Sequence, residues 1–102
     1  MKTAGWYVYM IETDQGQLYT GITTDPVRRF QEHTEGRGAR YFRAVKPKTM
    51  VFCREVVNRS HASSLEMKIK RMSRAEKWRM VSLEPDLPKW VIAGIDAYTE
   101  ER

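Results

Sequence analysis

Residues 6–23 read WYVYMIETDQGQLYTGIT, and this segment carries the main evidence for the architecture of the chain. Its first part, Trp6 to Ile11, is aromatic, β-branched or Met, as expected of a strand. Residues 13–16 supply turn chemistry, because Gly16 can take the left-handed conformation, and residues 17–23 resume the strand pattern. We therefore predict a β-hairpin with a short loop, in which Tyr9 lies roughly opposite Tyr19.

A helix should follow the hairpin directly. Asp25 is a good N-cap residue and Pro26 suits the first helical position, so we expect a helix that runs to about Glu35 and ends at Gly36. The helical spacing predicts that Val27, Phe30 and Thr34 form the inward face of this helix. Arg29 and His33 then lie on the opposite face.

The rest of the chain is expected to add one strand and further helices. Lys46-Pro47-Lys48 indicates a break, and Cys53 is interpreted as a small buried hydrophobe. In the helix predicted at 61–72, Glu66 borders a core stripe of Ala62, Leu65, Ile69 and Met72. The predicted elements are a short helix at 39–45, a strand at 49–57, a helix at 61–72 capped by Ser60, a helix opened by the capping box of Ser73 and Glu76 and ending before Glu84, and a last helix after Asp86 with Val91, Ile95 and Tyr98 on one face.

These elements predict an α+β fold, in which helices flank a small three-stranded antiparallel sheet in a single domain. We expect residues 1–84 to form the domain. Residues 85–102 are expected to be a helical C-terminal extension and not an independent domain.

Length and composition exclude several classes of protein. The 102 residues suffice for one small domain, and three Trp, five Tyr and three Phe argue against a disordered chain. Trp6–Ile11, the longest apolar stretch, is far shorter than the roughly 20 residues of a membrane span, and the start does not read as a secretion signal. One Cys cannot form an internal disulfide, and no Cys/His cluster has zinc spacing. We therefore expect a cytoplasmic protein with no membrane partner.

The positive charge is concentrated in the middle of the chain. Between Arg28 and Arg79 there are 15 Lys or Arg and five Asp or Glu, whereas the rest of the chain holds three basic and eight acidic residues. Aromatic residues are interleaved with basic ones in Arg40-Tyr41-Phe42-Arg43. This distribution favours a surface that binds a polyanion, although an ordinary solvated surface has the same composition.

The spacing of the two hairpin tyrosines, of Arg29 and His33, and of Glu66 resembles that in the GIY-YIG nuclease family. The similarity is greatest to the small stand-alone bacterial members of that family. The two short motifs of the family correspond to Tyr7-Val8-Tyr9 and Tyr19-Thr20-Gly21, with Tyr7 in place of the usual Gly and Thr20 in place of the usual Ile. Residues 23–33 resemble the helix with Arg and His that follows in structure-specific members. The resemblance spans Trp6 to Val81 and also includes Gly36-Arg37-Gly38-Ala39-Arg40-Tyr41 and Glu66 with Ile69-Lys70 and Ser73-Arg74.

The resemblance implies a catalytic site and a divalent ion, Mg²⁺ or Mn²⁺, held by Glu66. Tyr9 would activate the attacking water or pass its proton to His33, and Arg29 would stabilise charge on the phosphoryl group. Some members carry an Asn about twelve residues beyond the catalytic Glu, where this chain has Trp78. The implied catalytic residues are Tyr9, Tyr19, Arg29, His33 and Glu66, and the implied substrate-binding residues are Gly21, Arg28, Arg37, Arg40, Lys70 and Arg74.

For each of the implied catalytic residues, the alternative is a purely structural role. Tyr9 and Tyr19 would then form a cross-strand aromatic pair, and Glu66 would be the i,i+4 ion-pair partner of Lys70. Arg29 and His33 then belong to a solvated helix face.

The function that we expect is metal-dependent endonucleolytic hydrolysis of DNA, structure-specific or without sequence specificity, in DNA repair or processing. Branched or single-stranded DNA fits best, and RNA stays open as a substrate. The alternative is a non-catalytic nucleic-acid-binding protein that keeps the nuclease fold, and a third class is a partner-binding module. Sequence alone leaves the oligomeric state undecided.

Overall fold

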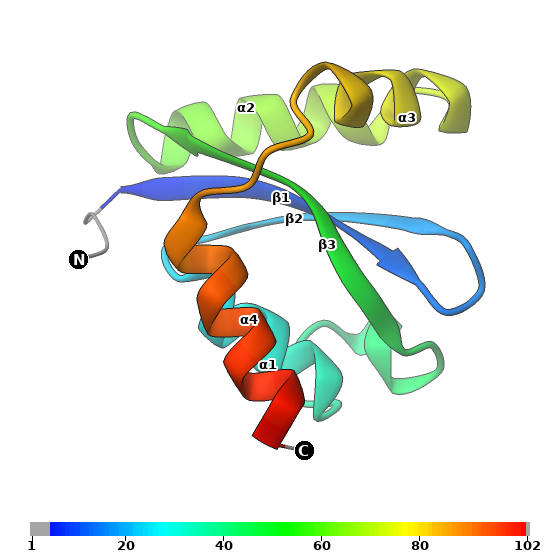
Figure 1. The fold of residues 1–102 in the computed structure, drawn as a ribbon. Helices are drawn as coiled ribbons and strands as arrows, with labels where there is room; N and C mark the ends of the chain where they lie inside the picture. The colour runs from blue at the N-terminus through cyan, green and yellow to red at the C-terminus, as the bar shows by residue number, and fades with distance from the viewer. Residues whose placement is uncertain (1–4, 102) are drawn as a thin grey trace.

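A computed structural model of the chain describes residues 5–101 and contains one three-stranded antiparallel sheet (Figure 1). Its central strand is β1 (Trp6–Thr13), which lies between β2 (Leu18–Thr23) and β3 (Pro47–Val56). Both neighbours run antiparallel to β1. The structure confirms the predicted α+β fold with a small antiparallel sheet and flanking helices.

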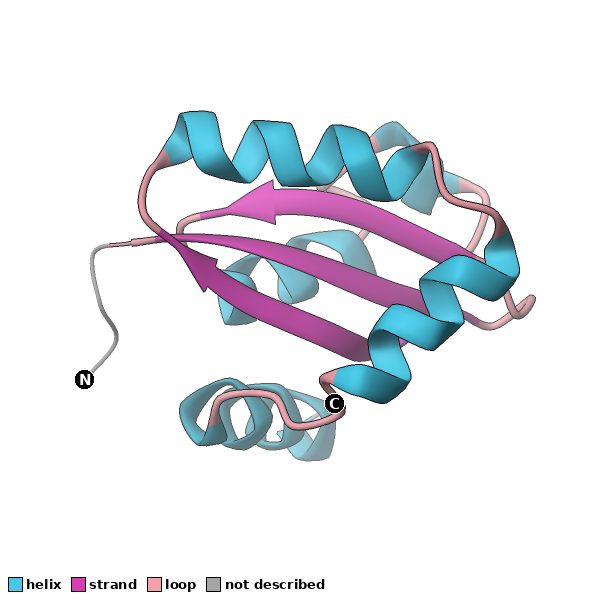
Figure 2. Cartoon of the chain, turned by 90° about the horizontal axis from the view of Figure 1, so that it is seen from above, coloured by secondary structure: helices cyan, strands magenta, loops and turns pink. Residues whose placement is uncertain are grey.

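Helices cover both faces of this sheet (Figures 1 and 2). On one face lie α2 (Arg59–Lys70) and α3 (Arg74–Leu83), over a core made by Val8, Met10, Phe52, Val56, Ala62 and Ile69. On the other face lie α1 (Pro26–Thr34) and α4 (Lys89–Glu101), over a second core made by Tyr9, Ile11, Phe30, Phe42, Met50 and Val91. Alternation along β1 sends its side chains into the two cores in turn.

The hairpin forms as predicted, but its register differs from the prediction. Gly16 has a φ of +78°, and the N–H of Thr13 donates to the carbonyl of Gln17 at 2.9 Å. Tyr9 then lies directly opposite Gly21, and Tyr19 lies opposite Ile11. The expected Tyr9–Tyr19 pair is wrong by two residues along β2, because the strands close at Thr13 and Gln17 and the turn therefore lies later in the chain than that pairing requires. The two rings still meet diagonally, with centroids 6.3 Å apart.

Helix α1 has the predicted ends and a different buried face. The Asp25 carboxylate caps it by accepting from the N–H of Arg28 at 3.2 Å, and Gly36 takes a φ of +77° after its end. The buried residues are Pro26, Phe30 and His33. His33 was expected opposite the inward face of the helix, and that expectation is wrong because its side chain is fully buried. Val27 instead packs against Gly94 of α4, and the hydroxyl of Thr34 donates back to the carbonyl of Phe30.

Several element boundaries differ from the sequence prediction. The segment 39–45 forms only a short 3₁₀ helix, η1 (Arg40–Arg43), and β3 begins at Pro47, where a break was expected. Because β3 is an edge strand and Pro47 is its first residue, the missing N–H costs no ladder bond. The N-cap of α2 is Asn58 and not Ser60, because β3 ends at Val56 and the Asn58 side chain accepts from the N–H of His61 at 2.9 Å.

The C-terminal elements pack onto this body. The capping box of Ser73 and Glu76 opens α3 as expected. In α4, Val91 is fully buried, and the ring of Trp90 meets the ring of Tyr7 edge-on with centroids 5.9 Å apart. Within residues 5–101, no helix combines the length and the apolar character that crossing a membrane requires.

Candidate active site

The phenol of Tyr9 lies across the edge strand β2. A Cβ atom built on Gly21 would lie 2.5 Å from the hydroxyl oxygen of Tyr9 and 2.7 Å from its Cζ. Any side chain at position 21 would therefore occupy the place of the phenol. Family resemblance implied that Gly21 binds substrate, and the structure shows that its missing side chain makes room for Tyr9.

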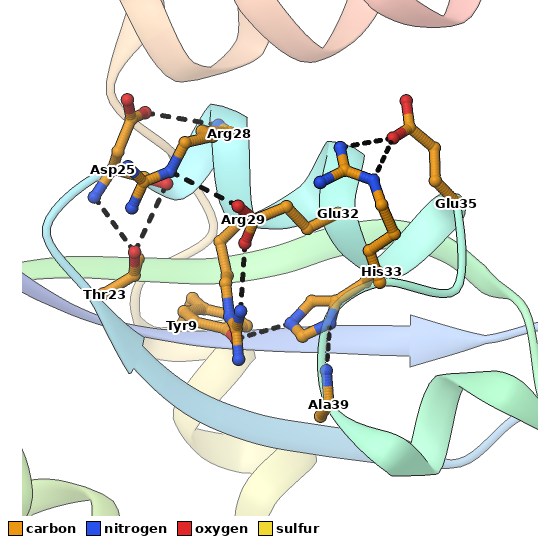
Figure 3. Close-up of polar contacts among 10 residues, drawn as sticks. Tyr9, Thr23, Asp25, Arg28, Arg29, Glu32, His33, Glu35 and Ala39 are labelled. Atoms are coloured by element: carbon orange, nitrogen blue, oxygen red, sulfur yellow. Dashed lines mark hydrogen bonds and ion pairs between the residues drawn. The ribbon is translucent and has the colours of Figure 1, made fainter.

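His33 holds the Tyr9 hydroxyl from the side of α1. Its Nε2 lies 2.7 Å from the Tyr9 oxygen, and its Nδ1 accepts from the backbone N–H of Ala39 at 3.2 Å (Figure 3). The imidazole is fully buried, and Phe42 lies beside it with ring centroids 4.3 Å apart. The ring therefore has a fixed partner at each nitrogen.

Arg29 approaches the same hydroxyl from one helical turn earlier. Its guanidinium opposes the rise in the Tyr9 pKa that burial causes, and its Nη1 lies 2.9 Å from a Glu32 carboxylate oxygen. Its side chain is 32% exposed, so one side of the cation is open to solvent. Glu32 also pairs with Arg28 at 3.7 Å (Figure 3). Glu32 thus orients Arg29 at the border between the interior and the solvent.

Tyr19 lies at the centre of an aromatic cluster, because its ring contacts those of Tyr9, His33, Tyr41 and Phe42. Its ring centroid lies 5.5 Å from that of His33 and 5.4 Å from that of Tyr41, on which it stacks. The Tyr41 hydroxyl in turn donates to the side chain of Gln17 beside the hairpin turn. The cluster extends the site from Tyr9 along the sheet edge toward η1.

Glu66 enters from α2, on the opposite face of the sheet. Its side chain is 21% exposed and lies 3.3 Å from the Lys70 ammonium group. Burial is the main reason why the pKa values of Tyr9 and Tyr19 are raised, and the Glu66 charge adds to both shifts, whereas the Lys70 charge lowers the pKa of Tyr19. The i,i+4 pair of Glu66 and Lys70, which is the structural alternative to a catalytic role, is therefore present, and both of its charges act on the tyrosines.

Burial sets the protonation state of the central groups. Desolvation is the main reason why the pKa of Tyr9 is raised, and Arg29 opposes this shift. Burial also lowers the pKa of His33 to about 4, with a further contribution from the Arg29 charge. Burial opposes the charge of Arg29, but hydrogen bonds with Glu32 and Tyr9 raise its pKa overall. At neutral pH the free protein therefore holds a phenol, a neutral imidazole and a guanidinium cation in contact.

The predicted substrate-binding cations lie in several places. Arg28, Arg40, Lys70 and Arg74 have exposed side chains, and the Arg74 guanidinium lies 3.8 Å from where a Cβ of Gly16 would be, above the hairpin turn. Arg37 is exposed too, but its Nε donates to Glu35 at 2.9 Å, and Glu35 also accepts from Tyr98 of α4 at 2.9 Å. Arg37 is therefore held toward α4, whereas Arg74 and Lys70 lie toward the hairpin and Tyr19.

Sequence reasoning missed the roles of four residues: Glu32, Ala39, Tyr41 and Phe42. The aromatic residues were visible in Arg40-Tyr41-Phe42-Arg43, but only as a possible nucleic-acid surface. The contact of Phe42 with His33 depends on how η1 folds back on α1, which no periodic pattern encodes. Ala39 acts through its backbone, so its side chain carries no signal.

The acidic side chains fit one mode of metal binding. Within the described part of the chain, no group of three or more His, Cys, Asp or Glu side chains is placed to hold a metal ion. Mg²⁺ commonly keeps several waters and binds through one or two carboxylates together with substrate phosphates. A single, partly exposed carboxylate such as Glu66 fits Mg²⁺ or Mn²⁺ held jointly with a bound phosphate, and it does not fit the closed coordination typical of structural zinc.

Comparisons with known proteins give the same assignment. The model of the GIY-YIG catalytic domain matches residues 5–80. UPF0213 proteins of Photorhabdus laumondii and Yersinia pestis are 42% and 40% identical over 80 and 87 residues, which cover 78% and 85% of this chain and 77% and 92% of theirs. The NMR structure of a UPF0213 protein of Bacillus halodurans is 37% identical, with a TM-score of 0.53, and the match covers 79% of this chain and 86% of that one.

The matched region of the family model contains the whole candidate site. It begins just before β1, includes Tyr9, Tyr19, Arg29, His33 and Glu66, and ends inside α3, so that α4 lies beyond it. A match over most of the chain, together with relatives of this identity, shows that the chain belongs to the GIY-YIG catalytic domain family, a family of nucleases.

Proposed function

We propose that this protein is a metal-dependent endonuclease that hydrolyses phosphodiester bonds in DNA. One observation carries the proposal: the buried Tyr9 hydroxyl is hydrogen-bonded to His33 at 2.7 Å, and the Arg29 cation opposes the rise in the Tyr9 pKa that burial causes. A cross-strand aromatic pair without function needs neither the hydrogen bond nor the cation. A phenol that the imidazole of His33 orients within reach of a guanidinium charge is arranged for proton transfer next to bound phosphate.

The surroundings of each residue support a distinct role. Tyr9 takes a proton from the attacking water, and Tyr19 holds that water or a phosphate oxygen. Arg29, whose charge is permanent, stabilises negative charge on the phosphoryl group through its guanidinium fork. Glu66 is the residue that would hold the metal ion. A bound Mg²⁺ supplies Lewis-acid polarisation of the phosphate and positive charge that favours the Tyr9 phenolate.

We propose branched or single-stranded DNA as the substrate, in repair or processing. The exposed cations Arg40, Lys70 and Arg74 suit phosphate contacts, which position nucleic acid without reading its sequence. The stacked pair of Tyr19 and Tyr41 lies beside the proposed site, and aromatic rings bind unpaired bases without sequence preference. Cutting is therefore proposed to depend on the structure of the nucleic acid.

A second candidate function is nucleic-acid binding without cleavage. It is favoured by Trp78, which stands in α3 at the position where some members of the family carry an Asn. The two functions differ in what they require of Glu66, since only cleavage needs a carboxylate there.

The decisive experiment compares Glu66→Gln with wild type on labelled branched, single-stranded and duplex DNA and on RNA, each with Mg²⁺ or Mn²⁺. The loss of the carboxylate should reduce cleavage by about 100-fold or more, while the affinity for DNA is unchanged or increased. Glu100→Gln is the matched control, because Glu100 is an exposed carboxylate on α4. Unchanged cleavage by Glu66→Gln would remove Glu66 from the site, and wild type that cuts no substrate with either ion would favour the binding function.

A further inference from the structure

The backbone between α1 and η1 closes over the imidazole of His33. The carbonyl of Glu32 accepts from the N–H groups of Arg37, at 2.8 Å, and Gly38, at 3.0 Å, which turns the chain back over the helix end. A Cβ atom on Gly38 would lie 2.1 Å from Nδ1 of His33 and 2.8 Å from its Cε1. Only a residue without a side chain fits there. The next residue, Ala39, then directs its N–H at Nδ1.

We propose that the Ala39 N–H is a positioning group that fixes His33 as the Nε2–H tautomer, so that His33 donates to Tyr9 and does not receive its proton. A backbone N–H can only donate a hydrogen bond, so Nδ1 must present its lone pair. A neutral imidazole then carries its single proton on Nε2. That nitrogen lies 2.7 Å from the Tyr9 oxygen, which leaves the oxygen as the acceptor of the bond.

The surroundings of the ring keep it neutral. His33 is fully buried, Phe42 covers it, and the Arg29 cation also disfavours a second positive charge. Glu32 acts in the opposite sense, but it is engaged by Arg29. The neutral form that the tautomer argument requires is therefore the form present at neutral pH.

The tautomer decides the direction of proton transfer in the proposed reaction, and this part of the inference rests on the proposed function. The Nε2–H of His33 donates to the Tyr9 oxygen, and the guanidinium of Arg29, whose charge also acts on Tyr9, can only donate as well. As water attacks phosphorus and the bond to the leaving oxygen breaks, the water proton passes to the Tyr9 phenolate. The leaving oxygen takes a proton from solvent, and Tyr9 later returns its proton to solvent. A relay from Tyr9 into His33, which we considered from the sequence, has no vacant nitrogen to receive the proton.

The test is the substitution Ala39→Pro. Ala39 has φ −62° and ψ 145°, which are dihedral angles that proline adopts, so the backbone conformation tolerates the change that deletes the N–H donor. Because the proline Cδ takes the place of an N–H that points at Nδ1, the imidazole of His33 must shift in this variant. Ala39→Ser is the matched control, because it keeps the N–H and also changes the side chain. Long-range ¹H–¹⁵N NMR of the uniformly ¹⁵N-labelled protein distinguishes a protonated ring nitrogen from one with a lone pair and requires no enzymatic activity.

We expect wild type and Ala39→Ser to show only the Nε2–H tautomer of His33, and Ala39→Pro to show a mixture of both. Wild type with its proton on Nδ1, or an Ala39→Pro spectrum identical to that of wild type, would overturn the proposal. The wild-type spectrum alone can overturn it, so the test does not depend on the folding of the proline variant. Gly38→Ala should remove the same hydrogen bond by displacing the loop, and it provides a second route to the altered spectrum.

Cleavage assays separate this inference from the proposed function. Ala39→Pro should cut about tenfold more slowly than Ala39→Ser at neutral pH, which corresponds to one hydrogen bond. The rising limb of its pH–rate profile should move to higher pH, because the Tyr9 phenolate loses a donor and the pKa of Tyr9 rises. If the spectra change as expected and even wild type cuts nothing, the tautomer assignment stands and the nuclease proposal fails.

Discussion

Gly21 and Gly38 each leave room for a ring. At Gly21 the space holds the phenol of Tyr9, and at Gly38 it holds the imidazole of His33. The two rings are joined by the 2.7 Å contact of Tyr9 with His33. The geometry of the site therefore depends on two residues that contribute no side-chain atom to it.

Gly21→Ala should disturb both stability and cleavage. The added methyl group would lie 2.5 Å from the Tyr9 oxygen, and overpacking of this kind typically costs about 1–3 kcal/mol of unfolding free energy. Urea denaturation measures the cost, and we expect cleavage to fall at least tenfold with it. In a Tyr9→Ala background most of the cost should disappear. An equal cost in both backgrounds would show that the methyl group clashes with something other than Tyr9.

His33 should make the protein less stable in mild acid. Its pKa is lowered to about 4 in the folded chain, against about 6.5 when unfolded, so the unfolded state binds an extra proton between these values. The His33 contribution is complete above pH 6.5 and is lost as the pH falls toward 4, by about 3 kcal/mol in all. Denaturation curves at pH 7, 5.5 and 4.5 measure this slope. His33→Asn should flatten it, whereas His61→Asn, at an exposed histidine, should leave it unchanged.

Among the elements, α4 is the one that lies beyond the family match and still contributes to the core. It packs on α1, the helix that carries Arg29 and His33, and Trp90 covers Tyr7 on the central strand. The predicted division of the chain at residue 84 stays a prediction. The packing of α4 indicates that residues 89–101 support the position of α1.

Substitution in α4 tests this support. Val91 is fully buried, and Val91→Ala should lower the free energy of unfolding by about 2 kcal/mol through lost burial and an unfilled cavity. Ile92 is its neighbour on the same helix and is 44% exposed, so Ile92→Ala should cost much less. Thermal or urea unfolding of both variants gives the comparison. Equal losses for the two would contradict the burial of Val91 as the source of the stabilisation, because both changes to Ala raise helix propensity.

The elements also show what sequence reasoning can reach. The hairpin, the Asp25 cap and the Ser73 capping box were predicted because each depends on residues close together in the chain. The register of Tyr9 was missed by two residues along β2, because the composition of residues 13–16 does not fix which pair of residues closes the turn. The burial of His33 was missed because it depends on η1 folding against α1, a contact between distant segments. The convergence of the candidate residues entered only through family resemblance, since no local rule relates Glu66 in α2 to Tyr9 in β1.

At the scale of the whole molecule, the structure shows where the basic and acidic residues of the sequence lie. Lys70 and Arg74 lie near Tyr19 and the hairpin turn. Helix α4 holds acidic residues such as Asp96 and Glu100 and packs on the far side of the sheet from α2 and α3. The basic residues Lys70 and Arg74 are thus separated in space from the acidic residues of α4, whereas the basic residues of α1 lie on the same face of the sheet as α4.

Nucleic-acid affinity should depend on salt through these cations. If Arg74 contacts a phosphate, Arg74→Glu should weaken the binding of a labelled single-stranded oligonucleotide and reduce the slope of log K against log salt by about 0.7, the value for one contact on a single strand. Lys89→Glu is the matched control, because Lys89 is an exposed cation at the start of α4. Fluorescence anisotropy over a range of salt concentrations measures both slopes. Equal effects of the two substitutions would indicate a response to net charge alone.

The strand order β2-β1-β3 also has a consequence for folding kinetics. The hairpin of β1 and β2 needs only a four-residue loop, and hairpins of this kind form within microseconds. The pairing of Trp6 with Val56 must instead close a loop of about fifty residues, which carries a larger entropic cost. We expect Tyr9 and Gly21 to meet early and Glu66 to arrive late, so that the assembly of the site is limited by the docking of β3 and α2.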